Sequence, residues 1–194
     1  MRVSELRGFR ALALAVLLVG CATPYVQGRA ALSEGRYDEA AGHFREVLAA
    51  DPARTDALTG LGVALYKQGA LDPAVDALKR AVAAAPQNCE ARVYLGLGHL
   101  RRAEDRAAEA ELTALRALKL HERIAAQLDR ALSVLRLAGL ADEVRVFVAA
   151  SLEDELEWER EVREARQAPR AFMQPTWFFF WDARERYPYG WWCP

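Results

Sequence analysis

The sequence has few of the residues that build metal centres, disulfide frameworks or catalytic sites. It contains three histidines and three cysteines in 194 residues. His43, His99 and His121 do not have the spacing of metal ligands, and neither a His-x3-His nor a Cys-x2-Cys motif occurs. A glycine-rich phosphate loop is also missing from the sequence. We therefore expect no metal, no cofactor and no enzymatic activity.

An excess of charge of one sign is also missing. The 26 Lys and Arg residues nearly balance 27 Asp and Glu residues, for a net charge of -1, and no cluster of five or more basic residues occurs. Such a chain has no positive field to attract a polyanion, so we expect no nucleic-acid partner. Hydrophobic residues make up 53% of the chain, which is enough for one sizeable domain.

The first twenty residues have the features of a targeting segment. Three arginines precede an unbroken apolar run over 11–19, which is shorter than the roughly 20 residues of a transmembrane helix. The run ends in Leu18-Val19-Gly20-Cys21, which resembles the lipobox of bacterial lipoproteins. The resemblance implies a signal peptide over 1–20 and lipidation of Cys21; an ordinary secretory signal or an uncleaved anchor is the alternative. Ala22, rather than Asp, follows the cysteine, which favours the outer membrane facing the periplasm.

A 34-residue period follows a short predicted tether over 21–27. Four positions recur at this spacing: Gly28, Gly62 and Gly96; Ala40, Ala74 and Ala108; Phe44, Leu78 and Leu112; and Pro52, Pro86 and Leu120. In the middle copy the apolar residues fall at i, i+3, i+4 and i+7, which predicts two amphipathic helices. The small Gly62 and Ala74 allow these helices to pack closely, and Gly69 provides the turn between them.

This pattern resembles the tetratricopeptide repeat (TPR). The resemblance implies an all-α, TPR-like solenoid of helical hairpins, with about three repeats over 28–120. Thr55 to Asn88 fits best, and the opening helix of the first copy is predicted to be short. In the third copy Leu120 replaces the closing proline, so we expect this copy to run on into the next segment.

Residues 121–168 predict a further helical pair that caps the solenoid. Ile124, Leu128, Leu132 and Leu135 form one apolar stripe, and Gly139 separates it from the next helix. The second helix carries seven acidic and three basic residues over 151–166. Such a stretch is either a solvated capping helix or a docking face for a basic partner.

An aromatic-rich tail is predicted over 169–194. Ten of the 18 aromatic residues lie between Phe172 and Trp192. Contiguous aromatic residues are prone to aggregate unless they are covered. The tail could pack on its own solenoid, anchor a partner, or contact lipid headgroups or glycan. The candidate contact residues of the tail are Trp177, Phe179, Trp181, Trp191 and Trp192.

The TPR resemblance also implies a binding surface, because the first helix of each pair lines the concave face in that family. Carried over by position, the candidate partner-binding residues are Arg29, Thr59, Val63, Tyr66, Lys67, Val93, Leu97, Leu100 and Arg101. This set is more apolar than charged, and no asparagine stands at these positions as the carboxylate-clamp members require. The groove would accept an apolar or aromatic segment, or Val93 and Leu97 are simply core residues.

Two cysteines remain once lipidation of Cys21 is counted. Cys89 opens the third copy and Cys193 is the penultimate residue. In an oxidising compartment they could form a disulfide, or they could be independent thiols.

Together these features predict a membrane-anchored scaffold of the bacterial cell envelope that binds proteins or peptides. The alternative is a cell-wall or polysaccharide-binding lipoprotein that uses the Trp- and Tyr-rich tail. The sequence identifies no particular partner and no oligomeric state.

Overall fold

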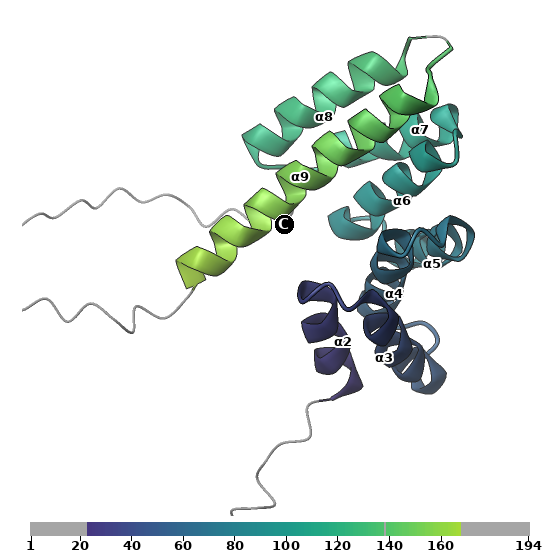
Figure 1. Cartoon of the computed structure of the whole chain (residues 1–194), viewed down its shortest axis with the longest axis vertical. Helices are drawn as coiled ribbons and strands as arrows, with labels where there is room; N and C mark the ends of the chain where they lie inside the picture. Colours follow the sequence, from purple (N-terminus) through teal and green to yellow (C-terminus); the bar gives the residue numbers. More distant parts are fainter. Residues whose placement is uncertain (1–22, 138, 168–194) are drawn as a thin grey trace, which may run out of the picture.

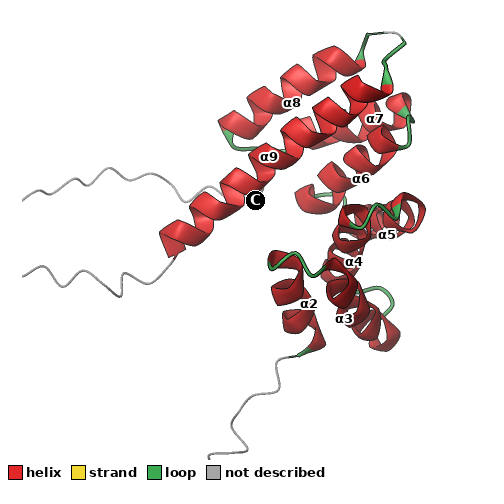
Figure 2. Ribbon diagram, in the orientation of Figure 1, coloured by secondary structure: helices red, strands yellow, loops and turns green. Residues whose placement is uncertain are grey.

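The chain folds into a stack of helical hairpins (Figures 1 and 2). The computed structural model describes residues 23–137 and 139–167, which contain eight helices and no strand. In chain order the helices are α2 (Pro24–Ser33), α3 (Tyr37–Ala50), α4 (Thr55–Lys67), α5 (Leu71–Ala84), α6 (Cys89–Arg101), α7 (Asp105–Arg116), α8 (Glu122–Leu135) and α9 (Asp142–Gln167). The predicted all-α, TPR-like solenoid is confirmed.

The helix boundaries repeat with the period of the sequence. The second helices of the first three hairpins start at Tyr37, Leu71 and Asp105, and the first helices of the second and third hairpins start at Thr55 and Cys89. Within each of these two sets, consecutive starts are 34 residues apart. The repeat in the sequence is therefore a repeat of structural units.

Glycine allows the two helices of a hairpin to pack closely. A Cβ atom added to Gly62 would lie 2.4 Å from Cγ of Leu78, and one added to Gly96 would lie 2.7 Å from Cδ2 of Leu112. These separations are shorter than a carbon–carbon contact allows, since such contacts are about 3.5–4.0 Å at optimum. A larger residue would thus push the helices apart, as the sequence predicted.

The turns inside the three repeated hairpins share one backbone conformation. Gly35, Gly69 and Ala103 are spaced by 34 residues and have positive φ angles of 76°, 81° and 59°. After Gly69 the chain forms both bonds of a Schellman motif: Gly69 N donates to Tyr66 O, and Ala70 N donates to Leu65 O. Equivalent bonds occur around Gly35 and Ala103. The third copy therefore places alanine where the other two use glycine.

Two expectations about boundaries need correction. The predicted tether over 21–27 is helical from Pro24 onward, because proline at the first helical position loses no hydrogen bond. The third copy does not run on without a break, since α7 ends at Arg116 and α8 begins at Glu122. His121 caps α8, with its ring nitrogen accepting from the amide of Arg123, so no proline is needed to separate the helices.

One hydrophobic core runs from α2 to α9. It includes Leu128, Ala131, Leu132 and Leu135 of α8 and Val148, Ala149 and Leu152 of α9. The fourth hairpin is arranged differently from the others, because α8 packs against α7 whereas α9 packs against α6. Figure 1 shows α9 running beside α8, with α6 on its other side. Across the described residues, none of the helices combines the length and the hydrophobicity needed to cross a bilayer.

Candidate functional site

The first helices of the repeated hairpins lie side by side and form one inner surface. α4 contacts both α2 and α6. Two polar contacts bridge these helices: Arg29 of α2 lies 3.6 Å from Glu90 of α6, and the side-chain amide of Asn88 donates to Thr59 of α4 at 3.0 Å. These first helices are therefore adjacent, and the surface that they share is called the inner surface below.

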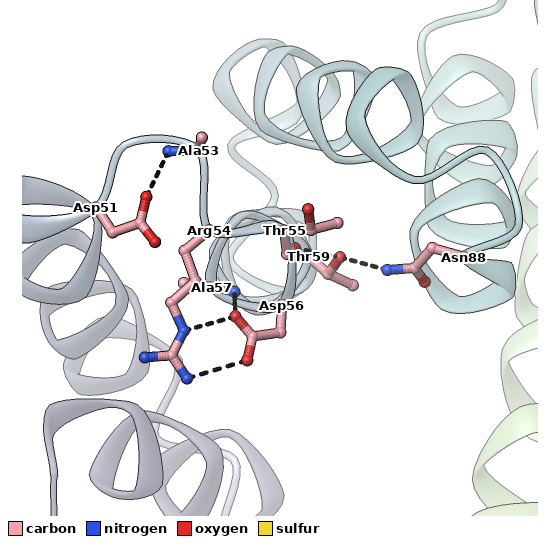
Figure 3. A network of polar contacts seen from close by, with 8 residues as sticks. All are labelled: Asp51, Ala53, Arg54, Thr55, Asp56, Ala57, Thr59 and Asn88. Carbon is pink, nitrogen blue, oxygen red and sulfur yellow. Dashed lines mark hydrogen bonds and ion pairs between the residues drawn. The ribbon is translucent and has the colours of Figure 1, made fainter.

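Thr59 has a structural role on this surface, as Figure 3 shows. Its buried hydroxyl donates to the carbonyl of Thr55 at 2.9 Å and accepts from the Asn88 amide. Asn88 also caps α6, since its Oδ1 accepts from the amide of Ala91 at 3.0 Å. The hydroxyl is thus already engaged in a contact between repeats.

A second polar pair holds the start of α4 beside this network. Arg54 donates to both carboxylate oxygens of Asp56, at 2.8 and 3.1 Å, and the two side chains are drawn in Figure 3. This hydrogen-bonded guanidinium lowers the pKa of Asp56. The Arg54 guanidinium also lies 4.6 Å from the ring centre of Tyr25, which connects α4 to α2.

The apolar candidates of the inner surface are buried. Val63, Val93, Leu97 and Leu100 belong to the core that also contains residues of α9. Their burial agrees with the interpretation of Val93 and Leu97 as core residues. That they bind a partner stays a prediction, and Val93, Leu97 and Leu100 would first have to be exposed for a partner to contact them.

Tyr66, Lys67 and Arg101 form the polar part of the inner surface. The Tyr66 hydroxyl donates to Glu153 of α9 at 2.5 Å, and Lys67 Nζ lies 2.7 Å from Glu153 and 2.6 Å from Glu157. The Arg101 guanidinium lies 5.0 Å from the centre of the Tyr66 ring, and it donates to the Tyr66 carbonyl at 3.3 Å. Three of the predicted residues are therefore brought together, and two of them hold α9.

Burial and pairing shift the titration of these groups in definite directions. Burial, followed by the hydrogen bond to Glu153, raises the pKa of Tyr66, so its hydroxyl stays protonated as a donor. Burial opposes the charge on Lys67, but the hydrogen bonds to Glu153 and Glu157 outweigh it and raise the pKa of the ammonium. Lys67 is accordingly a cation whose side chain is only 16% exposed.

A cleft of about 290 Å³ opens beside Lys67. Its walls come from the end of α2, the turn that follows, the start of α3, and from α4, α6 and α9: Leu32, Ser33, Glu34, Gly35, Tyr37, Val63, Lys67, Tyr94, Glu157 and Arg160. Hydroxyl groups and charges of both signs line it, without the convergent nucleophile and base that catalysis needs. Such a lining is suited to contacts with a polypeptide.

A comparison with protein families finds a match for the first two hairpins, which contribute α2 and α4 to the inner surface. Residues 25–88 match the family model described as a tetratricopeptide repeat. Over residues 25–88 the chain is therefore similar to tetratricopeptide repeats. The match covers the first two hairpins, including Tyr66 and Lys67. The TPR fold suggests interaction between proteins rather than catalysis.

Solved structures extend the likeness in fold to more of the chain. The type III secretion translocator chaperone SycD of Yersinia enterocolitica aligns with a TM-score of 0.55 and 17% identity, over 58% of this chain and 81% of SycD. MamA aligns with a TM-score of 0.52 and 23% identity, over 66% of this chain and 72% of MamA. A search of curated proteins finds no match.

Charged pairs also attach α9 to the rest of the TPR stack. Arg145 donates to both carboxylate oxygens of Asp105 in α7, at 2.7 and 2.8 Å. Arg123 of α8 pairs with Glu155, and its guanidinium lies 3.7 Å from the centre of the Trp158 ring. Glu153, Glu155 and Glu157 therefore contact the solenoid, whereas other carboxylates of this stretch are exposed, so its role as a solvated cap or as a docking face stays a prediction.

The sequence pointed to Lys67 but not to its partners. Glu153 and Glu157 were interpreted only as members of an acidic stretch, although Leu152-Glu153 and Leu156-Glu157 repeat at the spacing of one helix turn. That repeat was the available signal. It could not identify Lys67, because 86 residues separate Lys67 from Glu153.

Of the remaining candidate residues, only Cys89 lies within the residues that the structure describes. Cys89 is buried at the start of α6, whereas Cys193 lies outside the described residues, so their pairing stays a prediction. Cys21 and the aromatic candidates Trp177, Phe179, Trp181, Trp191 and Trp192 also lie outside them. Within the described part of the chain, no group of three or more His, Cys, Asp or Glu could hold a metal ion.

Proposed function

We propose that this protein is a lipid-anchored scaffold of the bacterial cell envelope, which binds partner polypeptides through the inner surface of its TPR stack. The cleft beside Lys67 is the observation that carries the proposal. It opens on the inner surface, and its walls combine tyrosine hydroxyls, a lysine, an arginine and carboxylates from the α2–α3 turn, α3, α4, α6 and α9. Mixed polar groups around an apolar core are typical of surfaces that bind proteins.

The anchor rests on the sequence alone. The charged start, the apolar run over 11–19 and the cysteine at position 21 support acylation of Cys21. Several acyl chains on one residue would hold the chain firmly, at about 0.8 kcal/mol per buried CH2. We propose the outer membrane, on its periplasmic side, as the location.

Photo-crosslinking in growing cells tests the binding surface. A photoreactive residue at Arg29, on the inner surface, should give discrete protein adducts that mass spectrometry can identify. The matched position is Lys79, which is exposed on the second helix of the middle hairpin. It should give far fewer adducts. Equal labelling from the two positions would argue against the inner surface as the binding site.

Metabolic labelling with an alkyne fatty acid tests the anchor. Cys21→Ser should abolish both the label and recovery in the membrane fraction, whereas Cys193→Ser should retain both. A Cys21→Ser chain that still carries the label would show that acylation occurs elsewhere. Separation of the two membranes on a density gradient then tests the proposed location.

A further inference from the structure

The two halves of α9 are attached to the TPR stack in different ways. The first half contributes Val148, Ala149 and Leu152 to the core and is fixed by the bidentate pair between Arg145 and Asp105. From Glu153 onward only Leu156 packs against the core among the described side chains. The attachment there is made mainly by charged groups. This half gives up only one partly buried core side chain when it separates, so it is the easier one to displace.

At Lys67, side chains of α9 bind to side chains of α4 as a bound peptide helix would. Glu153 and Glu157 are four residues apart, so both carboxylates lie on one face of α9. Both bind the same ammonium, at 2.7 and 2.6 Å, and Glu153 also accepts from the Tyr66 hydroxyl. Tyr66 and Lys67 lie within the matched repeats, whereas α9 lies outside them. A helix from outside the repeats therefore occupies the inner surface.

The contact can also be reached from solvent. Lys67 and Glu157 both line the 290 Å³ cleft, together with Ser33, Tyr37 and Arg160. An approaching segment could therefore reach the ion pair between Lys67 and Glu157 before the core of α9 opens. This order would allow a stepwise exchange of one helix for another.

We infer that the second half of α9 is an internal competitor for the partner site, and that the partner presents an acidic amphipathic helix with a Leu-Glu pair repeated after four residues. Such a helix matches the inner surface because it reproduces Leu152-Glu153 and Leu156-Glu157. Its two carboxylates would pair with Lys67, and one of them would accept a hydrogen bond from the Tyr66 hydroxyl, as the carboxylates of α9 do. This inference rests on the proposed function, since it specifies the partner of the same surface.

A binding assay with a peptide tests the competition. The probe is a fluorescent synthetic peptide with the sequence of residues 142–167, and the receptor is the full chain purified in mild detergent. Replacing Glu153→Gln and Glu157→Gln in the chain weakens the internal contact and leaves Lys67 in place. Fluorescence anisotropy should then show that the peptide binds the double variant roughly tenfold more tightly than it binds the unaltered chain. The reason is that α9 has lost its two carboxylate contacts with Lys67 and competes less well.

The matched control removes two charges from the same helix. Asp154→Asn with Glu161→Gln alters exposed residues of α9 and should leave the affinity for the peptide unchanged. If the Glu153 and Glu157 double variant binds no more tightly than this control, α9 does not compete for the site and the inference is wrong.

A third variant tests whether the peptide uses Lys67. Adding Lys67→Met to the Glu153 and Glu157 double variant should remove the gained affinity, while a circular dichroism melt confirms that the chain is still folded. Retention of tight binding would overturn the assignment of the site. If sedimentation shows that the chain itself dimerises by exchange of α9, the occupant is a second copy and the partner inference fails.

The peptide assay and the crosslinking experiment can fail separately. Competition in the peptide assay without adducts from Arg29 in cells would contradict the proposed function and leave the internal competition intact. Adducts from Arg29 without competition would support the inner surface as a binding site and overturn the role of α9.

Discussion

The middle hairpin and the last hairpin show two ways of building the same kind of unit. α4 and α5 have 13 and 14 residues and pack closely at Gly62. α8 and α9 have 14 and 26 residues, and the position one period after Gly96 is Arg130, which is exposed. The last hairpin therefore lacks the small residue that sets the approach of the helices in the repeats.

The two hairpins differ in whether helix packing is determined by residues nearby in the sequence or by residues far away in it. In the middle hairpin, small residues and a left-handed turn within one 34-residue unit determine how the helices pack. In the last hairpin, α9 is positioned by side chains that lie far away in the chain: Asp105, Arg123, Tyr66 and Lys67. The first arrangement can be copied along a solenoid, whereas the second is specific to one end of it.

Gly62→Ala should have the largest effect, because it breaks the local packing of the middle hairpin. The new methyl group would lie 2.4 Å from Cγ of Leu78, which is fully buried. Overpacking of this kind should reduce the free energy of unfolding by about 3 kcal/mol in urea titrations. Gly42→Ala is the control, since nothing lies within 4 Å of that position. Because Gly42 is an exposed position of α3, this substitution should stabilise the helix by about 0.5 kcal/mol. Equal effects would show that packing at Gly62 is not limiting.

Leu152→Ala tests the last hairpin in the same way. Leu152 is buried where α9 joins the core, and its truncation should cost about 2 kcal/mol of unfolding free energy. Phe147→Ala on the same helix should change stability by less than about 0.5 kcal/mol, since Phe147 is 73% exposed. A similar cost for both would mean that α9 is held by a different face.

The regular part of the fold was predictable from the sequence because its determinants are local. The spacing of Gly28, Gly62 and Gly96 predicted the hairpins, and Gly69 predicted a turn. The turn at Ala103 shows where local signals are incomplete. The third copy keeps the left-handed conformation without glycine, so the hairpin as a whole imposes it.

The candidate site was predictable only in part. Lys67 and Arg101 could be placed on the inner surface by their positions in the repeat. The role of Glu153 and Glu157 depends on the path of α9, which is set by tertiary contacts such as the pair of Arg145 with Asp105. A single sequence gives the charge of α9 but not the surface against which it packs.

Exchanging glycine and alanine at the left-handed turn position compares the second hairpin, which has Gly69, with the third, which has Ala103. Gly69→Ala should destabilise the chain by about 1 kcal/mol, because an L side chain is unfavourable at φ of 81° and no neighbouring atom adds a steric term. Ala103→Gly should stabilise it by a similar amount, about 1 kcal/mol, less the added entropy of the unfolded chain. Thermal melts of both variants provide the measurement. Destabilisation by Ala103→Gly would show that the methyl group of Ala103 contributes more packing than its conformation costs.

Asp105→Asn should have the smallest effect, and its dependence on pH identifies the cause. The hydrogen-bonded Arg145 lowers the pKa of Asp105 in the folded chain, so its contribution is complete above about pH 4 and is lost as the pH falls through the folded pKa. At pH 7 the loss should be about 0.5 kcal/mol, since Asp105 is partly exposed to solvent. Asp38→Asn, in the first turn of α3, controls for the helix dipole. The extra cost of Asp105→Asn over this control should shrink steadily in urea titrations between pH 4 and pH 3. A difference that stays constant over this range would mean that Asp105 positions α9 through hydrogen-bond geometry rather than through its charge.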